Sequence, residues 1–153
     1  MGSERVEQVT LRVPSDLRYG EATRAYLDTL TRRLEEETAT PSLNAHVISA
    51  FGEAFNNVVW HAYGGQRTGE VEITVEVAPA GITVKIADRG SSFDIDSVED
   101  PDLPSMPEGG LGLWIIRSLM STVTYERGEP NVITMVKDFQ EPLTFSDDNQ
   151  EEV

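Results

Sequence analysis

Apolar and polar residues alternate along five segments of the chain, and a period of two is typical of strands with one buried face. The alternation is strict over residues 70–77 and looser over residues 6–13, where Pro14 ends the pattern and favours a place at a sheet edge. A short turn at residues 79–81 predicts a hairpin. The predicted strands cover residues 6–13, 70–77, 82–86, 122–126 and 132–136.

Three other segments carry apolar residues at intervals of three and four, the spacing of an amphipathic helix. The first helix begins near Leu17, where Asp16 can cap it, and the second begins after a possible cap at Ser42 and runs to about His61. The third starts at the glycines of residues 109–112. The predicted order of elements is therefore β-α-α-β-β-loop-α-β-β.

This order places few strands on either side of a single helix, which argues against a doubly wound parallel sheet. It favours an α+β fold of two layers, a mainly antiparallel mixed sheet with the helices packed on one face. We expect one domain over residues 1–138 and an acidic, disordered tail over residues 139–153. Residues 91–108 contain three prolines and several acidic residues, and we expect them to form a mobile loop.

Composition and charge narrow the possible functions. The chain has 153 residues, no cysteine and a formal net charge of −15. No disulfide framework or thiolate metal site is therefore available, and we expect neither a signal peptide nor a membrane span. The acidic balance argues against a nucleic acid or an anionic membrane as the main partner, because both bind basic surfaces. ATP remains possible, since it arrives with a metal ion and occupies a small local site.

Glu53 and Asn57 lie four positions apart on the second predicted helix, so their side chains emerge on one face. A carboxylate can accept a proton from a hydroxyl, and an amide oxygen can bind Mg²⁺, which prefers hard oxygen ligands. Asn56 adds a second amide to a helix that is otherwise apolar, although asparagine is a poor helix former. The pattern fits a catalytic base beside a magnesium ligand, and it also fits an ordinary solvated pair.

Asp88 is expected at the end of the third predicted strand, the return strand of the hairpin, and Gly90 follows it two residues later. A carboxylate there can accept a hydrogen bond from the exocyclic amine of adenine, while glycine lets the base approach the backbone. A plain turn at a strand end would use the same residue types.

The sequence Gly-Gly-Leu-Gly at residues 109–112 leads directly into the third helix. Glycine lets backbone N–H groups approach a phosphate, and a helix N-terminus favours anions, so Gly110, Leu111 and Gly112 are candidate phosphate-binding residues. The segment is neither a P-loop nor a dinucleotide fingerprint, and a flexible hinge is the alternative. Together, the three motifs supply the parts of an ATP site in one order within about 60 residues.

This ordered set resembles the GHKL ATPases, and within them the small anti-sigma regulatory factors that act as serine protein kinases. The matching segments are residues 48–63, 84–94 and 109–121, and the likeness extends over residues 8–138. The resemblance implies that residues 91–108 form an ATP lid. It also implies one role for each matching residue: Glu53 as catalytic base, Asn57 as ligand of Mg²⁺, Asp88 and Gly90 at adenine, Gly110, Leu111 and Gly112 at phosphate, and Thr134 near the adenine pocket.

The family resemblance further implies a cytoplasmic homodimer that phosphorylates a serine of a small STAS-domain antagonist and otherwise sequesters a sigma factor. One departure keeps a second hypothesis open, because no Lys or Arg lies between Arg89 and Arg117 to reach the γ-phosphate. That hypothesis is a non-catalytic, ATP-gated protein-binding module. A sensor histidine kinase would need a phosphoacceptor helix pair, and a gyrase-type or chaperone-type ATPase would need further domains.

Overall fold

The computed structural model describes residues 5–91 and 110–146, with only the backbone at Gly110 and Leu111. The elements follow the predicted order, and one turn of π-helix after the second helix is an addition to it. Their bounds are β1 Glu7–Pro14, α1 Leu17–Glu37, α2 Leu43–Asn57, η1 Val58–Ala62, β2 Glu70–Ala78, β3 Gly81–Asp88, α3 Gly110–Leu119, β4 Thr122–Glu126 and β5 Asn131–Asp138.

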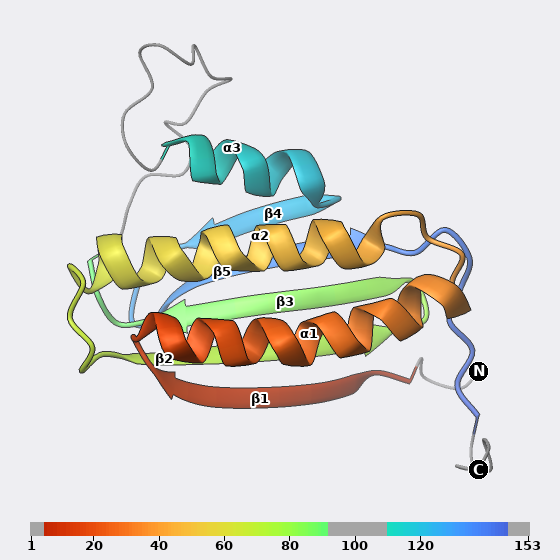
Figure 1. The fold of residues 1–153 in the computed structure, drawn as a ribbon, viewed down its shortest axis with the longest axis horizontal. Helices are drawn as coiled ribbons and strands as arrows, with labels where there is room; N and C mark the ends of the chain where they lie inside the picture. The colour runs from red at the N-terminus through yellow and green to blue at the C-terminus, as the bar shows by residue number, and fades with distance from the viewer. Residues whose placement is uncertain (1–4, 92–109, 147–153) are drawn as a thin grey trace.

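The strands form one sheet in the order β1-β2-β3-β5-β4, and the helices cover one of its faces (Figure 1). The predicted α+β fold of two layers is confirmed, as is the position of β1 at a sheet edge. Every pairing between the described strands is antiparallel, so the sheet is not a mixed one. Neighbouring strands are joined by hairpins or by connections that bring the chain back in the opposite direction, and no neighbouring pair of the described strands is joined by a parallel crossover.

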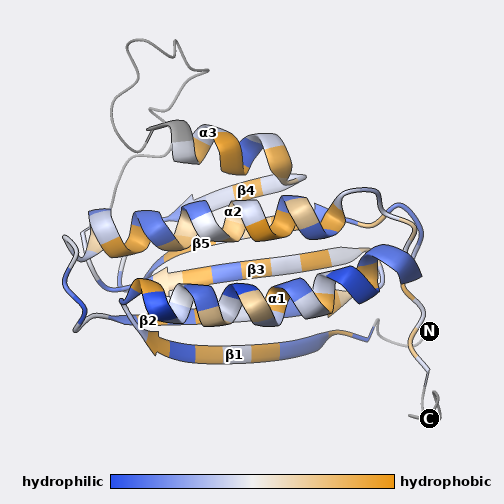
Figure 2. Ribbon diagram, viewed as in Figure 1, coloured by the Kyte–Doolittle hydropathy of each residue, from blue (hydrophilic) through white to orange (hydrophobic). Residues whose placement is uncertain are grey.

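The core lies between the sheet and the helices, as the pattern of apolar residues predicts (Figure 2). Alternate residues of β2, Val71, Ile73 and Val75, turn toward the helices and are buried. From the helices, Leu27 of α1 and Phe51 of α2 are fully buried against them. The period of two in the strands and the period near four in the helices therefore meet in one apolar layer.

The two predicted helix caps differ in outcome. Asp16 caps α1, and its side-chain oxygen accepts a hydrogen bond from the Arg18 backbone N–H at 3.0 Å. Ser42 does precede α2, but its φ of 63° lies in the left-handed region and its side chain makes no capping hydrogen bond. The backbone N–H of Asn44 instead donates to Glu35 Oε1 at 3.2 Å, so α1 supplies the cap of α2.

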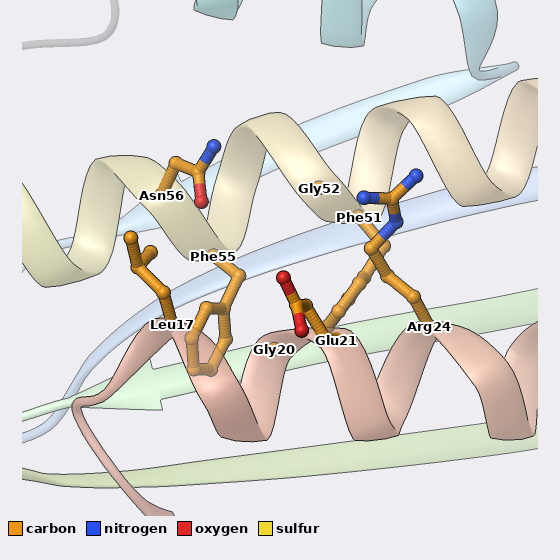
Figure 3. Close-up of a pocket in the computed structure, with 8 residues that line it drawn as sticks. All are labelled: Leu17, Gly20, Glu21, Arg24, Phe51, Gly52, Phe55 and Asn56. Atoms are coloured by element: carbon orange, nitrogen blue, oxygen red, sulfur yellow. The ribbon is translucent and has the colours of Figure 1, made fainter.

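A glycine brings α1 and α2 into close contact. Phe55 points from α2 onto the first turns of α1 beside Gly20 (Figure 3), and a Cβ at Gly20 would lie 2.6 Å from Phe55 Cδ1. A pocket of about 200 Å³ opens next to this contact, and both helices line it. Asn56 lines that pocket on the side of α2 that faces α1, whereas Glu53 and Asn57 lie against Gly112 of α3.

The chain continues along the domain past the expected boundary at residue 138. The backbone N–H of Phe139 donates to Ala80 O and that of Leu143 donates to Pro79 O, each at 2.9 Å. Leu143 is 7% exposed and belongs to the core, so residues 139–146 pack on the domain. The acidic residues of this segment favoured the prediction of a disordered tail and drew attention away from its apolar residues. The expected loop, apart from Ser91, and the last seven residues of the expected tail lie outside the described residues.

Candidate active site

Two of the sequence motifs meet where α2 and α3 lie side by side (Figure 1). A Cβ built on Gly112 would lie 3.0 Å from Glu53 Oε2 and 3.5 Å from both side-chain atoms of the Asn57 amide. The lack of a side chain at Gly112 therefore leaves a space that ends at a carboxylate and at an amide. The structure brings the candidate base, the candidate magnesium ligand and the glycine motif together, as the sequence predicts.

The polar groups around this space have unused hydrogen-bonding capacity. Asn57 is 9% exposed and Glu53 is half-buried, yet neither side chain forms a hydrogen bond or ion pair with another described residue. Polar groups in buried positions are normally paired, because leaving them without a partner costs free energy. An amide and a carboxylate without partners fit a ligand that brings a hydroxyl and a hard metal ion.

The start of α3 adds backbone donors to the same place. Gly110 is the first residue of the helix and Gly112 lies in its first turn, as predicted. The first N–H groups of a helix have no partner within the helix and carry its positive dipole end, so they favour phosphate. Gly109 lies outside the described residues, and the side chain of Leu111 is not described.

Asp88 ends β3 in a buried position and is 2% exposed. Its Oδ1 accepts hydrogen bonds from the Gly90 backbone N–H and from Asn131 Nδ2, each at 3.0 Å, whereas its Oδ2 accepts none from a described residue. Burial raises the pKa of Asp88, and the hydrogen bonds from Asn131 and Gly90 offset part of that rise. The carboxylate therefore keeps one oxygen available for a donor such as an amine.

Gly90 lies against the protein's own backbone. A Cβ there would collide with the backbone carbonyl of Ala62, the last residue of η1, which accepts a hydrogen bond from Ser91 N at 3.0 Å. The glycine is therefore required by the protein's own backbone. Since η1 directly follows Asn57, this contact fixes the end of β3 relative to the helix that carries Glu53 and Asn57.

Two residues to which the sequence analysis assigned no role hold the region around Asp88. The hydroxyl of Tyr63 donates to Glu70 O at 2.6 Å and accepts from Arg89 N at 2.9 Å, so it joins the ends of β2 and β3. Asn131, which is 1% exposed, bonds directly to Asp88. The sequence pattern could have identified Asn131, because it lies an even number of positions before the buried apolar residues of β5 and therefore on the same face of the strand.

Thr134 is the one candidate that the structure separates from the others. It pairs with Lys85 of β3, whereas Asp88 pairs with Asn131. Successive residues of a strand point to opposite faces of the sheet, and Thr134 lies three positions after Asn131. Asp88 and Asn131 face the helices, so Thr134 faces away from them. The prediction of Thr134 beside the adenine pocket was therefore wrong, and Asn131 occupies the position opposite Asp88.

The described residues combine a helix N-terminus, an unpaired carboxylate, an unpaired amide and a buried acceptor oxygen. Residues 5–91 and 110–146 contain no group of three or more His, Cys, Asp or Glu side chains placed to hold a metal ion, so a magnesium ion would rely on Asn57, phosphate and water. These features define a nucleotide-binding domain of the ATPase class, on an antiparallel sheet covered by helices.

The chain belongs to the histidine kinase-like ATPase domain family, whose model matches residues 13–137. Among its relatives, the serine-protein kinase RsbW of Oceanobacillus iheyensis is 35% identical over 109 residues, which cover 66% of this chain and 69% of that protein. The RsbW of Bacillus velezensis is 29% identical over 143 residues, or 88% of each chain. The RsbW of Staphylococcus aureus strain JH9 is 31% identical over 138 residues, or 84% of this chain and 85% of that one.

These relatives confirm the predicted family and its serine-protein kinase branch. They also confirm the predicted enzyme class, an ATP-dependent serine protein kinase, at the level of that branch. Within the described part of the chain, no helix combines the length and the apolar character that crossing a membrane requires.

Proposed function

We propose that this chain binds Mg-ATP between α2, Asp88 and the start of α3, and transfers the γ-phosphoryl group to a serine of a partner protein. The partner is a STAS-domain antagonist of the kinase, and phosphorylation of the antagonist frees the kinase to sequester a sigma factor. The observation that carries the proposal is the meeting of Gly112 with Glu53 and Asn57, because it joins a phosphate-binding helix start to a proton acceptor and a metal ligand.

Each residue has one role in this proposal. Asp88 accepts a hydrogen bond from the exocyclic amine of adenine, and the N–H groups at Gly110 and Gly112 bind phosphate. Asn57 holds Mg²⁺, whose charge offsets that of the phosphates. Glu53 accepts the proton of the attacking serine hydroxyl as the bond from serine oxygen to γ-phosphorus forms and the bond to the β-phosphate oxygen breaks.

The test is transfer of labelled phosphate from ATP to a purified STAS-domain candidate, compared between wild type and Glu53→Gln. The substitution keeps the shape of the side chain and removes the proton acceptor, so we expect it to lower transfer by about 10²–10⁴-fold while ATP still binds. Ser→Ala at the acceptor position of the STAS-domain protein controls for labelling elsewhere. Equal transfer by wild type and Glu53→Gln would exclude the assigned role of Glu53.

A second candidate function is an ATP-gated protein-binding module without phosphoryl transfer. The absence of Lys and Arg between Arg89 and Arg117 favours it, because no side chain from that stretch can neutralise charge on the transferred group. The same labelling experiment separates the two functions. ATP-dependent binding of the STAS-domain protein without any labelled product would identify the module.

We also propose that the protein acts in the cytoplasm as a homodimer. The support for a dimer is the edge strand β1, where Val9 is exposed and Val6, just before the strand, is exposed as well, although both are apolar. Exposed apolar edges of this kind are commonly covered by another chain. Light scattering coupled to gel filtration would give the mass in solution, and a monomer at all concentrations would exclude the dimer.

A further inference from the structure

Asn131 uses its side-chain amide almost completely inside the protein. Its Nδ2 donates to Asp88 Oδ1 and to Gly90 O, and its Oδ1 accepts from the Gly128 backbone N–H, all at 3.0 Å. The two acceptors near Nδ2 and the donor near Oδ1 fix the orientation of the amide, because the flipped side chain would place its oxygen against two other oxygens. A donor therefore faces Asp88 at this position.

The donor determines which oxygen of Asp88 remains available. Oδ1 is occupied by Asn131 and by the Gly90 backbone N–H. Because a carboxylate is planar, two hydrogen bonds at one oxygen also fix the direction of the other oxygen. Oδ2 is left without a hydrogen bond among the described residues, at the end of β3 that Gly90 holds against Ala62 of η1.

The residues that pair with Asp88 across the sheet are neutral. Opposite Asp88 stand Val71 on β2 and Asn131 on β5. The phenol of Tyr63 is engaged by backbone groups at Glu70 and Arg89, and no charged side chain of the described residues bonds to Asp88. Burial disfavours the ionised carboxylate, and the hydrogen bonds from Asn131 and Gly90 are what favour it.

We propose that Asn131 is a positioning residue that sets base specificity, because it keeps Asp88 ionised and turned so that Oδ2 accepts the exocyclic amine of a 6-aminopurine nucleotide. This inference rests on the proposed function. A 6-oxopurine such as guanine presents an acceptor oxygen where adenine presents its amine, and two acceptors cannot form a hydrogen bond. A protonated Asp88 would donate to that oxygen, so the charge of Asp88 decides which purine is preferred.

The test is calorimetric titration of ATP and of GTP into wild type and Asn131→Ala, from mildly acidic to slightly alkaline pH. Loss of a hydrogen bond to a charged group predicts about tenfold weaker ATP binding near neutral pH. Without the Asn131 donor the carboxylate is harder to ionise, so the pH at which ATP affinity falls to half moves upward. The ratio of ATP to GTP affinity falls at the same time.

Asn44→Ala is the matched control, because Asn44 is a half-buried asparagine whose Nδ2, like that of Asn131, donates hydrogen bonds within the protein, here to Asp28 and Thr31, far in sequence from Asp88. It should lower stability without changing the pH profile of nucleotide binding. Asn131→Asp, which keeps the shape and replaces the donor by an acceptor, should move the profile further than Asn131→Ala. In an Asp88→Asn background, Asn131→Ala should leave the ATP-to-GTP ratio unchanged.

Wild type alone supplies a check that does not depend on folding of the variants, since its ATP affinity should fall and its GTP affinity should rise as the pH is lowered. If Asn131→Ala weakened ATP and GTP binding by the same factor at every pH, with no shift in the pH dependence of ATP affinity, the role of Asn131 would be only structural. That result would overturn the inference. Absence of ATP binding by wild type would overturn the proposed function itself, which is a different outcome.

Discussion

The substitution Gly112→Ala tests whether Gly112 is needed for ligand binding or for folding. The added methyl group would lie 3.0 Å from Glu53 Oε2 and 3.5 Å from the Asn57 amide. The nearest atom ends a flexible side chain, so the carboxylate can move by a few tenths of an ångström at little cost. Alanine is favoured over glycine in a helix by up to about 1 kcal/mol. We therefore expect the free protein to be as stable as wild type or slightly more stable.

Nucleotide binding should respond in the opposite direction. The methyl group fills the space through which a phosphate must reach the N–H groups at the start of α3, and it pushes on both functional side chains. We expect ATP affinity to fall at least about tenfold, and phosphoryl transfer to fall about a hundredfold because the reacting groups are displaced. Thermal unfolding with and without Mg-ATP measures both effects, since a bound ligand raises Tm by mass action.

Gly52→Ala is the matched control for this experiment. Gly52 lies in the interior of α2 on the side that faces α1, where a Cβ would make an ordinary contact at 3.7 Å with Arg24 Nε. Alanine there should stabilise the protein by up to about 1 kcal/mol and leave the ATP-induced rise in Tm unchanged. The reasoning would be refuted if Gly112→Ala lowered the Tm of the free protein and kept the full ATP-induced rise.

Three further substitutions test other parts of the molecule. Asp88→Asn keeps an acceptor for both donors and removes a buried charge. Because burial raises the pKa of Asp88, the ionised carboxylate destabilises the fold as the pH rises through that pKa. The Tm of the variant should therefore exceed that of wild type most at neutral pH, and the difference should shrink as the pH is lowered. Leu143→Ala should cost about 2–4 kcal/mol in chemical denaturation, and no loss would mean that residues 139–146 do not belong to the domain. Gly90→Ala, which collides with the Ala62 carbonyl, should lower the stability of the free protein by about 2 kcal/mol or more in the same assay, whereas an unchanged midpoint would contradict the contact.

The fold followed from local patterns, because each element carries its own period. Strict alternation located β2 within a residue, and the stretch at residues 122–126 coincides with β4. The structure of the α2 start was not predictable in the same way, since the left-handed backbone at Ser42 and the cap from Glu35 depend on how α1 packs. The contribution of Leu143 to the core likewise depends on a contact with the β2–β3 turn.

The site was predictable where its residues share one element. Glu53 and Asn57 are brought together by a single helix, so spacing alone places them on one face. Pairs across strands depend on register, and a shift by one residue moves a side chain to the other face of the sheet. The choice of Thr134 ignored that alternation, which is why Asn131 was missed as the residue opposite Asp88.

The most direct test of the central claim is a calorimetric titration of ATP, with and without Mg²⁺, into wild type, Asn57→Ala and Asn56→Ala. Asn56 is exposed on the other side of α2 and serves as the matched control for the same substitution. We predict magnesium-dependent binding to wild type that is weakened in Asn57→Ala and unchanged in Asn56→Ala. No binding to wild type under either condition, or equal loss in both variants, would contradict an ATP site built on Asn57.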